Sequence, residues 1–205
     1  LIKNGNFANG TNNWLPSGST LSVSNNVLII KGTGSTIFTT AYQAGFLNAQ
    51  SHKLYISAYM RVRNDLAPEL RIKKETIVAG ITNPIKDTWY RISGITNNST
   101  NENIEFYALY SDTSSANEAI LELKDVMAID LTATFGSGNE PTKEQCDAMF
   151  PYYFDGTKSV SGSYQIKRVG KNKCDVTVGS ITRNGITCSV DSDGTITLNG
   201  TATQA

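Results

Sequence analysis

Hydrophobic and polar residues alternate along most of the first 130 or so positions, in short runs separated by turn residues. The clearest run is 54–63, in which every second residue is apolar. Successive side chains of a strand point to opposite faces of a sheet, so this run predicts a strand with one buried face. The buried face is formed by Leu54, Ile56, Ala58, Met60 and Val62.

Similar runs recur at intervals of roughly ten residues, which is the spacing typical of a β-sandwich. Turn signals precede several of them: Asn25-Asn26 before 27–30, Ala67-Pro68 before 70–72 and Asn83-Pro84 before 89–95. In the last of these runs four apolar residues share one phase, Leu121, Leu123, Met127 and Ile129, and we expect them on one buried face. The further strands are expected at 27–30, 70–72, 89–95, 104–110 and 119–131.

The pattern changes after position 134. A turn-rich stretch at 135–142 precedes 143–150, where Cys146, Met149 and Phe150 fall at helical spacing. Pro141 suits a first helical turn, and Thr142 with Gln145 forms a plausible capping pair. One short helix is therefore expected here.

Strand patterns return from 164, and 185–190 with 195–198 reads as a hairpin across the turn at 191–194. Two strands are too few for a stable domain, so we expect the chain to end inside a second β module. The predicted fold class is all-β: a jelly-roll β-sandwich at 1–133, a turn and short helical connector at 134–158, and a partial β module at 159–205.

Composition narrows the classes of partner. The 205 residues carry 18 Lys+Arg against 18 Asp+Glu, without a basic cluster, which argues against nucleic acid as a partner. No apolar run approaches the eighteen or more residues that a membrane helix needs, so we expect no membrane partner. The low charged fraction of 18%, with many Gly, Ser, Thr and Asn residues, favours an extracytoplasmic all-β protein.

A candidate ligand surface lies on the polar phase of the 54–63 strand. Sugars bind through stacking of their C–H faces on aromatic rings, while polar side chains take the hydroxyls. Tyr55, Tyr59, Arg61 and Arg63 have this character on the face opposite the predicted core. The alternative is that Tyr55 and Tyr59 only pack under a loop or a neighbouring subunit.

Two other strands could extend this surface. In 104–110, Glu105 and Tyr107 lie opposite in phase to Phe106, and they join the surface if their strand is a neighbour. Trp89 and Arg91 are further candidates, although a Trp that opens a strand can instead anchor the core.

Residues for catalysis do not assemble into a known pattern. The Asp and Glu residues are scattered, without an evident pair for glycoside hydrolysis. His52 is the single histidine, and no Gly-x-Ser-x-Gly elbow is present. Cys146, Cys174 and Cys188 are odd in number and lack a CxxC pair, so a zinc site is not indicated. The protein is therefore predicted not to be an enzyme and to require no cofactor.

Three stretches carry a resemblance to known families. The opening LIKNGNFANGTNNW at 1–14 resembles the start of carbohydrate-binding-module-like jelly rolls, which commonly read N-G-x-F-x-N-G-x-x-x-W. The stretch DLTATFGSGNEPTKEQ at 130–145, continuing to FDGTK at 154–158, resembles a segment of tail-associated and minor structural proteins of phages and prophages. The tail at 170–203 resembles the opening of another β module of such proteins.

The resemblance implies a receptor-binding component of a phage tail that attaches to the bacterial host surface, with localisation in the virion. Its partners would be a bacterial surface glycan and other tail subunits, and its assembly a homo-oligomer such as a trimer. The alternatives are an architectural tail spacer with protein contacts only, or a binding module of a secreted polysaccharide-degrading enzyme.

Jelly rolls of this family often hold a structural calcium between the N-terminal turn and the last strand. The resemblance assigns the late acidic position to Asp125, with carbonyl groups near Asn9 and Gly10 as further ligands. The position after Phe7, which is often acidic in the family, is Ala8 in this chain and departs from the pattern. A solvent-facing or hydrogen-bonded Asp125 is the alternative.

Overall fold

The computed structural model describes residues 1–44, 49–64, 67–153, 164–166, 179–183, 186–190 and 196–199. The chain divides into two compact units, Leu1–Asp155 and Gly156–Ala205. The first unit therefore extends past position 133, where the sequence pattern placed the end of the sandwich, and takes in most of the helical segment.

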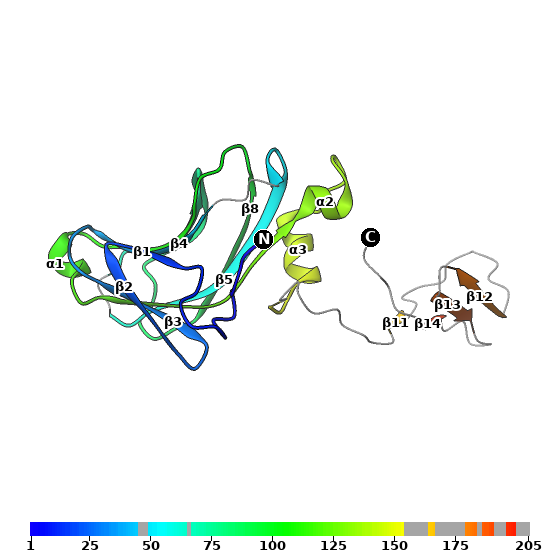
Figure 1. Cartoon of the computed structure of the whole chain (residues 1–205), viewed down its shortest axis with the longest axis horizontal. Helices are drawn as coiled ribbons and strands as arrows, with labels where there is room; N and C mark the ends of the chain where they lie inside the picture. Colours follow the sequence, from blue (N-terminus) through cyan, green and yellow to red (C-terminus); the bar gives the residue numbers. More distant parts are fainter. Residues whose placement is uncertain are drawn as a thin grey trace. The chain divides into compact units, whose positions relative to one another are not determined.

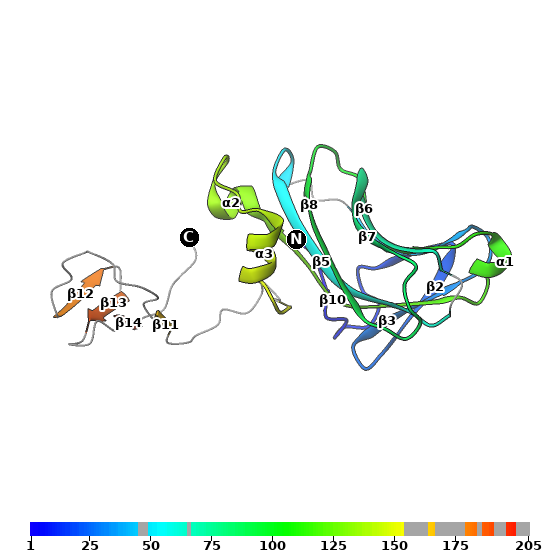
Figure 2. The same ribbon diagram turned by 180° about the vertical axis from the view of Figure 1, so that it is seen from behind.

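Two five-stranded antiparallel sheets form the first unit (Figures 1 and 2). Sheet A has the order β1-β4-β9-β6-β7, and sheet B the order β2-β3-β10-β5-β8. This arrangement confirms the all-β, jelly-roll sandwich that the sequence predicts. The strands of sheet A are β1 (Leu15–Ser17), β4 (Phe38–Gln43), β9 (Ile104–Leu109), β6 (Glu69–Lys74) and β7 (Thr76–Thr82). Those of sheet B are β2 (Ser19–Ser24), β3 (Val27–Gly32), β10 (Ile120–Asp130), β5 (Lys53–Val62) and β8 (Tyr90–Asn97).

The main core lies between the two sheets. All five apolar residues of the 54–63 run are fully buried in it, which confirms the predicted phase of β5. Trp14 joins the core beside Phe7 and Phe106, at ring-centroid distances of 5.2 and 5.6 Å. Gly5 brings the N-terminal turn against β10, because a Cβ there would overlap the carbonyl oxygen of Val126.

Strand β10 departs from the predicted single phase. Lys124 pairs with Tyr59 but Met127 with Ser57, so β10 holds one more residue than β5 over this stretch. Asp125 takes a left-handed conformation at this bulge, with a φ of 53°. Leu121 and Leu123 lie in the main core as expected, whereas Met127 and Ile129 face the other side of sheet B. The expectation of one buried face for all four residues is therefore wrong.

Two short helices cover the outer face of sheet B near the C-terminal end of β10, where Met127 and Ile129 lie (Figure 2). They are α2 (Leu131–Phe135) and α3 (Lys143–Met149), and they contact β5 and β8. Thr142 caps α3 and forms the predicted reciprocal pair with Gln145. A second hydrophobic group, the helix–sheet cluster, fills the contact and consists of Tyr55, Met127, Leu131 and Cys146. A third helix, α1 (Thr113–Ala116), lies at the opposite end of this unit (Figure 1).

The second unit contains a four-stranded sheet in the order β11-β14-β13-β12. Its strands are β11 (Tyr164–Ile166), β12 (Gly179–Arg183), β13 (Ile186–Val190) and β14 (Ile196–Asn199). Antiparallel pairing of β13 with β14 confirms the predicted hairpin strands. The turn at 191–194, Cys174 and the motif at 154–158 lie outside the described residues.

Candidate functional site

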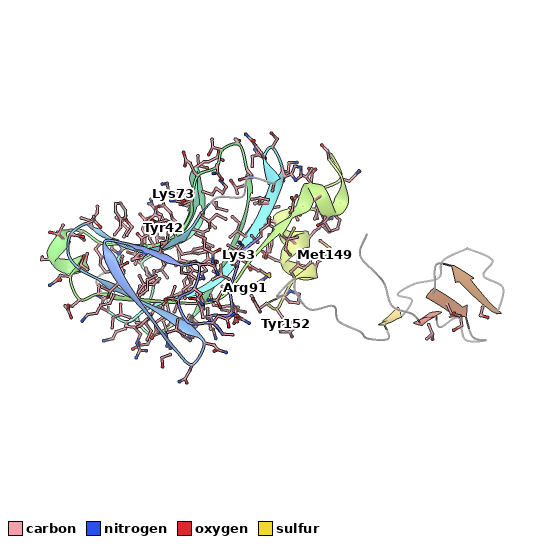
Figure 3. All side chains as sticks on the ribbon, viewed as in Figure 1. Lys3, Tyr42, Lys73, Arg91, Met149 and Tyr152 are labelled. Carbon is pink, nitrogen blue, oxygen red and sulfur yellow. The ribbon has the colours of Figure 1, made fainter. Side chains whose placement is uncertain are left out.

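A cleft of about 370 Å³ opens on the outer face of sheet A. Residues of β4 and β9 alternate between this face and the core, which brings Phe38, Thr40 and Tyr42 beside Glu105 and Tyr107. We call it the sheet-A cleft, and Figure 3 labels Tyr42 and Lys73 from two of its strands. Its lining residues are Ser17, Thr36, Phe38, Thr40, Tyr42, Lys73, Asn103, Glu105 and Tyr107.

Three aromatic rings give the cleft apolar surface. Phe38 and Tyr107 meet edge to face, with ring centroids 5.4 Å apart and an interplanar angle of 86°. Tyr107 is only 5% exposed, whereas Phe38 is 38% exposed and Tyr42 is half-buried. Leu15 of β1 lies directly opposite Tyr42 and is 51% exposed, so apolar surface continues to the edge of the sheet. This surface can stack against the C–H face of a ring-shaped ligand.

Polar groups of both kinds flank these rings. Lys73 Nζ lies 3.5 Å from Glu105 Oε1, so a donor and an acceptor sit side by side with their charges balanced. Arg71 lies two residues before Lys73, in the same phase of β6, and pairs with Glu69. Its hydrogen bond with Tyr107, followed by that with Glu69, raises the pKa of the Arg71 guanidinium. Arg71 therefore stays charged and helps to fix the Tyr107 ring.

Tyr55 does not belong to an exposed ligand surface, because its side chain is fully buried. Its burial agrees instead with the alternative that it packs under a covering segment. It does face away from the main core, but α3 covers it. Its hydroxyl donates to Asp147 Oδ1 at 2.6 Å and accepts a hydrogen bond from Arg91 Nη2 at 3.0 Å. Burial first, and then the bond to Asp147, raise the pKa of Tyr55 to about 12. Tyr55 and Arg91 thus hold α3 on sheet B; Figure 3 labels Arg91.

The other predicted residues of β5 form a cation–aromatic group on the uncovered part of sheet B. Arg61 Cζ lies 4.4 Å, and Lys124 Nζ 4.7 Å, from the ring centroid of Trp89. Lys124 also lies 5.4 Å from the ring centroid of Tyr59. Arg61 and Arg63 pair with Glu122, and Arg63 pairs with Asp87 as well. A ligand role for Tyr59, Arg61, Arg63 and Trp89 stays a prediction.

The structure does not join the two halves of the predicted surface. Glu105 and Tyr107 belong to sheet A, where β9 pairs with β4 and β6, while β5 belongs to sheet B. The condition for the extension, that β9 lies beside β5, is therefore not met, although both residues line the sheet-A cleft. Sequence reasoning missed Phe38 and Tyr42, because the run FTTAYQ at 38–43 has polar residues in both phases. It also missed Lys73 and Asn103, which only the packing of the strands brings to the cleft.

Calcium binding at Asp125 stays a prediction. The nearby N-terminal turn is braced by Asn4, whose Nδ2 donates to the carbonyl oxygens of Gly10 at 2.9 Å and Asn12 at 3.1 Å. Asn9 N donates to Asn4 Oδ1 at 3.1 Å. Within the described residues, no group of three or more His, Cys, Asp and Glu side chains could hold a metal ion.

The residues weighed for catalysis have structural contacts. His52 Nδ1 lies 2.7 Å from Asp130 Oδ2, and Asp130 Oδ1 caps α2 by accepting from Ala133 N. Cys146 is buried on α3, as expected for a packing residue, and burial raises the pKa of its thiol. In the described part of the chain, no helix is long and apolar enough to cross a membrane.

Comparison with known proteins gives matches among solved structures only. No family model and no curated protein matches this chain. A CBM4 structure is 14% identical, covers 63% of this chain and 99% of its own, and gives a TM-score of 0.45. The CBM22-2 xylan-binding domain from Paenibacillus barcinonensis Xyn10C is 15% identical, with coverage of 62% and 97% and a TM-score of 0.46. A family 29 carbohydrate binding module is 15% identical, with coverage of 57% and 81% and a TM-score of 0.36.

Proposed function

We propose that the first unit is a glycan-binding module and that its ligand occupies the sheet-A cleft. One observation carries this proposal: three aromatic rings and one ion pair line the same open cleft. They are Phe38, Tyr42 and Tyr107 with the Lys73–Glu105 pair. Aromatic rings can stack on the C–H face of a sugar, and the charged side chains can hydrogen-bond its hydroxyl groups.

Each group has a distinct part in binding. The half-buried ring of Tyr42 offers a face to the sugar, and the Phe38–Tyr107 pair forms a rigid wall. Lys73 donates to and Glu105 accepts from ligand hydroxyls, at no net charge. Because the Tyr107 ring is already held by Arg71 and Phe38, little side-chain entropy is lost on binding.

The proposed setting is a non-enzymatic phage tail component in the virion that attaches to glycans of the bacterial surface and contacts other tail subunits. The sequence resemblance of 130–145 supports this setting. An architectural spacer, or a binding module of a polysaccharide-degrading enzyme, is the alternative. The glycan experiment separates the spacer from the two binding roles.

The test is a glycan-array screen followed by calorimetric titration of the best ligand. Tyr42→Ala should weaken binding by about tenfold or more, corresponding to about 1.4 kcal/mol, because a stacking surface is removed. Tyr152→Ala is the matched control, since this tyrosine is 82% exposed and lies outside the cleft. It should bind as the wild type does.

Tyr59→Ala tests the competing surface on sheet B. Full binding by Tyr42→Ala together with a loss in Tyr59→Ala would move the site to the cation–aromatic group. Failure of the wild-type protein to bind any glycan or isolated cell wall would favour the spacer.

A further inference from the structure

Lys74 is a fully buried lysine at the end of β6. It shares the inward phase of Leu70 and Ile72, whereas its neighbour Lys73 faces the sheet-A cleft. A buried ammonium is costly unless its hydrogen bonds are satisfied. Lys74 Nζ donates to two backbone carbonyl oxygens, those of Thr100 and Glu102, each at 3.0 Å. It also lies 3.6 Å from Glu75 Oε1.

The segment that Lys74 holds is the connection between β8 and β9. Residues 99–103 read Ser-Thr-Asn-Glu-Asn, and all five are exposed. No apolar side chain anchors this segment, so polar bonds must define its conformation. Glu75 supplies another of them, because its Oε1 accepts from Thr100 N at 2.7 Å. That bond is the main reason why the pKa of the Glu75 carboxyl is lowered; the Lys74 charge lowers it further, whereas burial acts in the opposite direction.

The held segment leads directly into the cleft. Asn103 follows Glu102 in the chain and lines the sheet-A cleft together with Lys73 and Glu105. One of the two carbonyl groups bonded by Lys74, that of Glu102, therefore belongs to the residue just before Asn103. A shift of this backbone would move the Asn103 amide relative to the Lys73–Glu105 pair.

We propose that Lys74 is a positioning residue for ligand binding: its ammonium, with the Glu75 carboxylate, fixes residues 100–102 and thereby presents Asn103 at the cleft. The ligand role of Asn103 rests on the proposed function. Lys74 itself cannot touch a ligand, because it lies beneath the sheet. It acts by ordering a segment before binding, so that the ligand does not have to supply the ordering free energy.

The first measurement uses Lys74→Met in the full chain, which keeps an unbranched side chain one atom shorter and removes the ammonium. Hydrogen exchange at the Thr100 amide should accelerate at least tenfold, and glycan affinity should fall about tenfold. Lys31→Met is the matched control, because Lys31 is an exposed residue of β3 that pairs with Glu118. It should change neither quantity.

A double-mutant cycle separates positioning from a general loss of stability. Asn103→Ala and the double variant are titrated with the same glycan, well below their unfolding temperatures. If Lys74 acts through Asn103, Lys74→Met should cost little additional affinity once Asn103 is Ala. An equal loss in both backgrounds would overturn the proposal, as would wild-type affinity in Lys74→Met.

Glu75→Gln provides a second variant in case Lys74→Met does not fold. It keeps the shape of the side chain and removes the charge, so we expect a smaller change in the same direction in both measurements. Amide exchange also separates this proposal from the proposed function. If the wild type binds no glycan, the proposed function fails. If hydrogen exchange at the Thr100 amide is unchanged in both variants, the positioning role of Lys74 is wrong as well.

Discussion

At the scale of single residues, Tyr55 shows how one polar atom decides the role of a side chain. Its ring packs in the helix–sheet cluster, while its hydroxyl bonds both Asp147 of α3 and Arg91 of β8. Asp147 also accepts from Ser93 at 2.6 Å and pairs with Lys143. One carboxylate therefore ties α3 to sheet B through several donors.

This carboxylate predicts an acid-sensitive contact. Burial alone would raise the pKa of Asp147, but hydrogen bonds from Lys143, Ser93 and Tyr55 and the Lys143 charge bring it to about 2. The pKa of an Asp side chain in an unfolded chain is about 3.9. The stabilisation is thus present above that value and is lost as the pH falls from about 5 through 2.

Thermal unfolding between pH 6 and pH 2 measures this effect. Asp147→Asn should lower the melting temperature at pH 6, and its difference from the wild type should shrink towards zero near pH 2. A difference that stays constant over this range would show that the Asp147 charge does not stabilise the contact.

At the scale of elements, the bulge in β10 lets one strand serve two cores. Before Asp125, Leu121 and Leu123 fill the sandwich; after it, Met127 and Ile129 pack towards α2 and α3. A regular strand would have turned Met127 into the sandwich and left the helices without an apolar partner. The extra residue therefore determines where the helices can dock.

The left-handed backbone of Asp125 gives a direct test of the bulge. Asp125→Val should reduce the free energy of unfolding by about 1–2 kcal/mol, because a β-branched residue is strained at a φ of 53°. Asp125→Gly should keep or increase stability. Urea denaturation measures both.

Asp125→Asn is the control, since asparagine tolerates this conformation and only the charge is lost. If Asn destabilised as much as Val, the carboxylate rather than the backbone would be responsible. A calcium titration followed by thermal unfolding, with EDTA as the reference, would then decide whether that carboxylate binds a metal ion.

At the scale of the whole molecule, all residues of the proposed glycan site belong to the first unit. Both hydrophobic groups are made of residues from the first 153 positions, and so is the sheet-A cleft. The helical segment belongs to this unit because its apolar face is buried against sheet B.

A chain that ends at Asp155 should therefore fold alone. Its melting temperature should lie within a few degrees of that of the first transition of the full chain, and its glycan affinity should be the same. Ending the chain at 133 instead should lower the melting temperature, because Cys146 and Asp147 are removed from Tyr55. Calorimetry and titration of the two shortened chains test this, and equal stability would contradict a structural role for α3.

Local patterns predicted much of the fold but only part of the site. The phase of β5 and β9 and the Thr142 cap follow from neighbouring residues, and the structure confirms them. Glu105 and Tyr107 were recognised as a polar face for the same reason. Whether they join the strand of Tyr55 could not be predicted, because phase indicates which face of a strand a residue lies on and not which strands lie beside it; β9 and β5 belong to different sheets.

The sequence by itself determined the positions of the capped helix and of the strands β3, β5, β6, β8, β9 and β10, and the apolar side of β5 and β9, because these depend on contacts within a few residues. Only the tertiary structure decided that β5 and β9 join different sheets, that α3 covers Tyr55, and that Phe38, Tyr42 and Lys73 meet Glu105. Strand pairing joins residues far apart in the chain, and alternation looks the same in whichever sheet a strand lies.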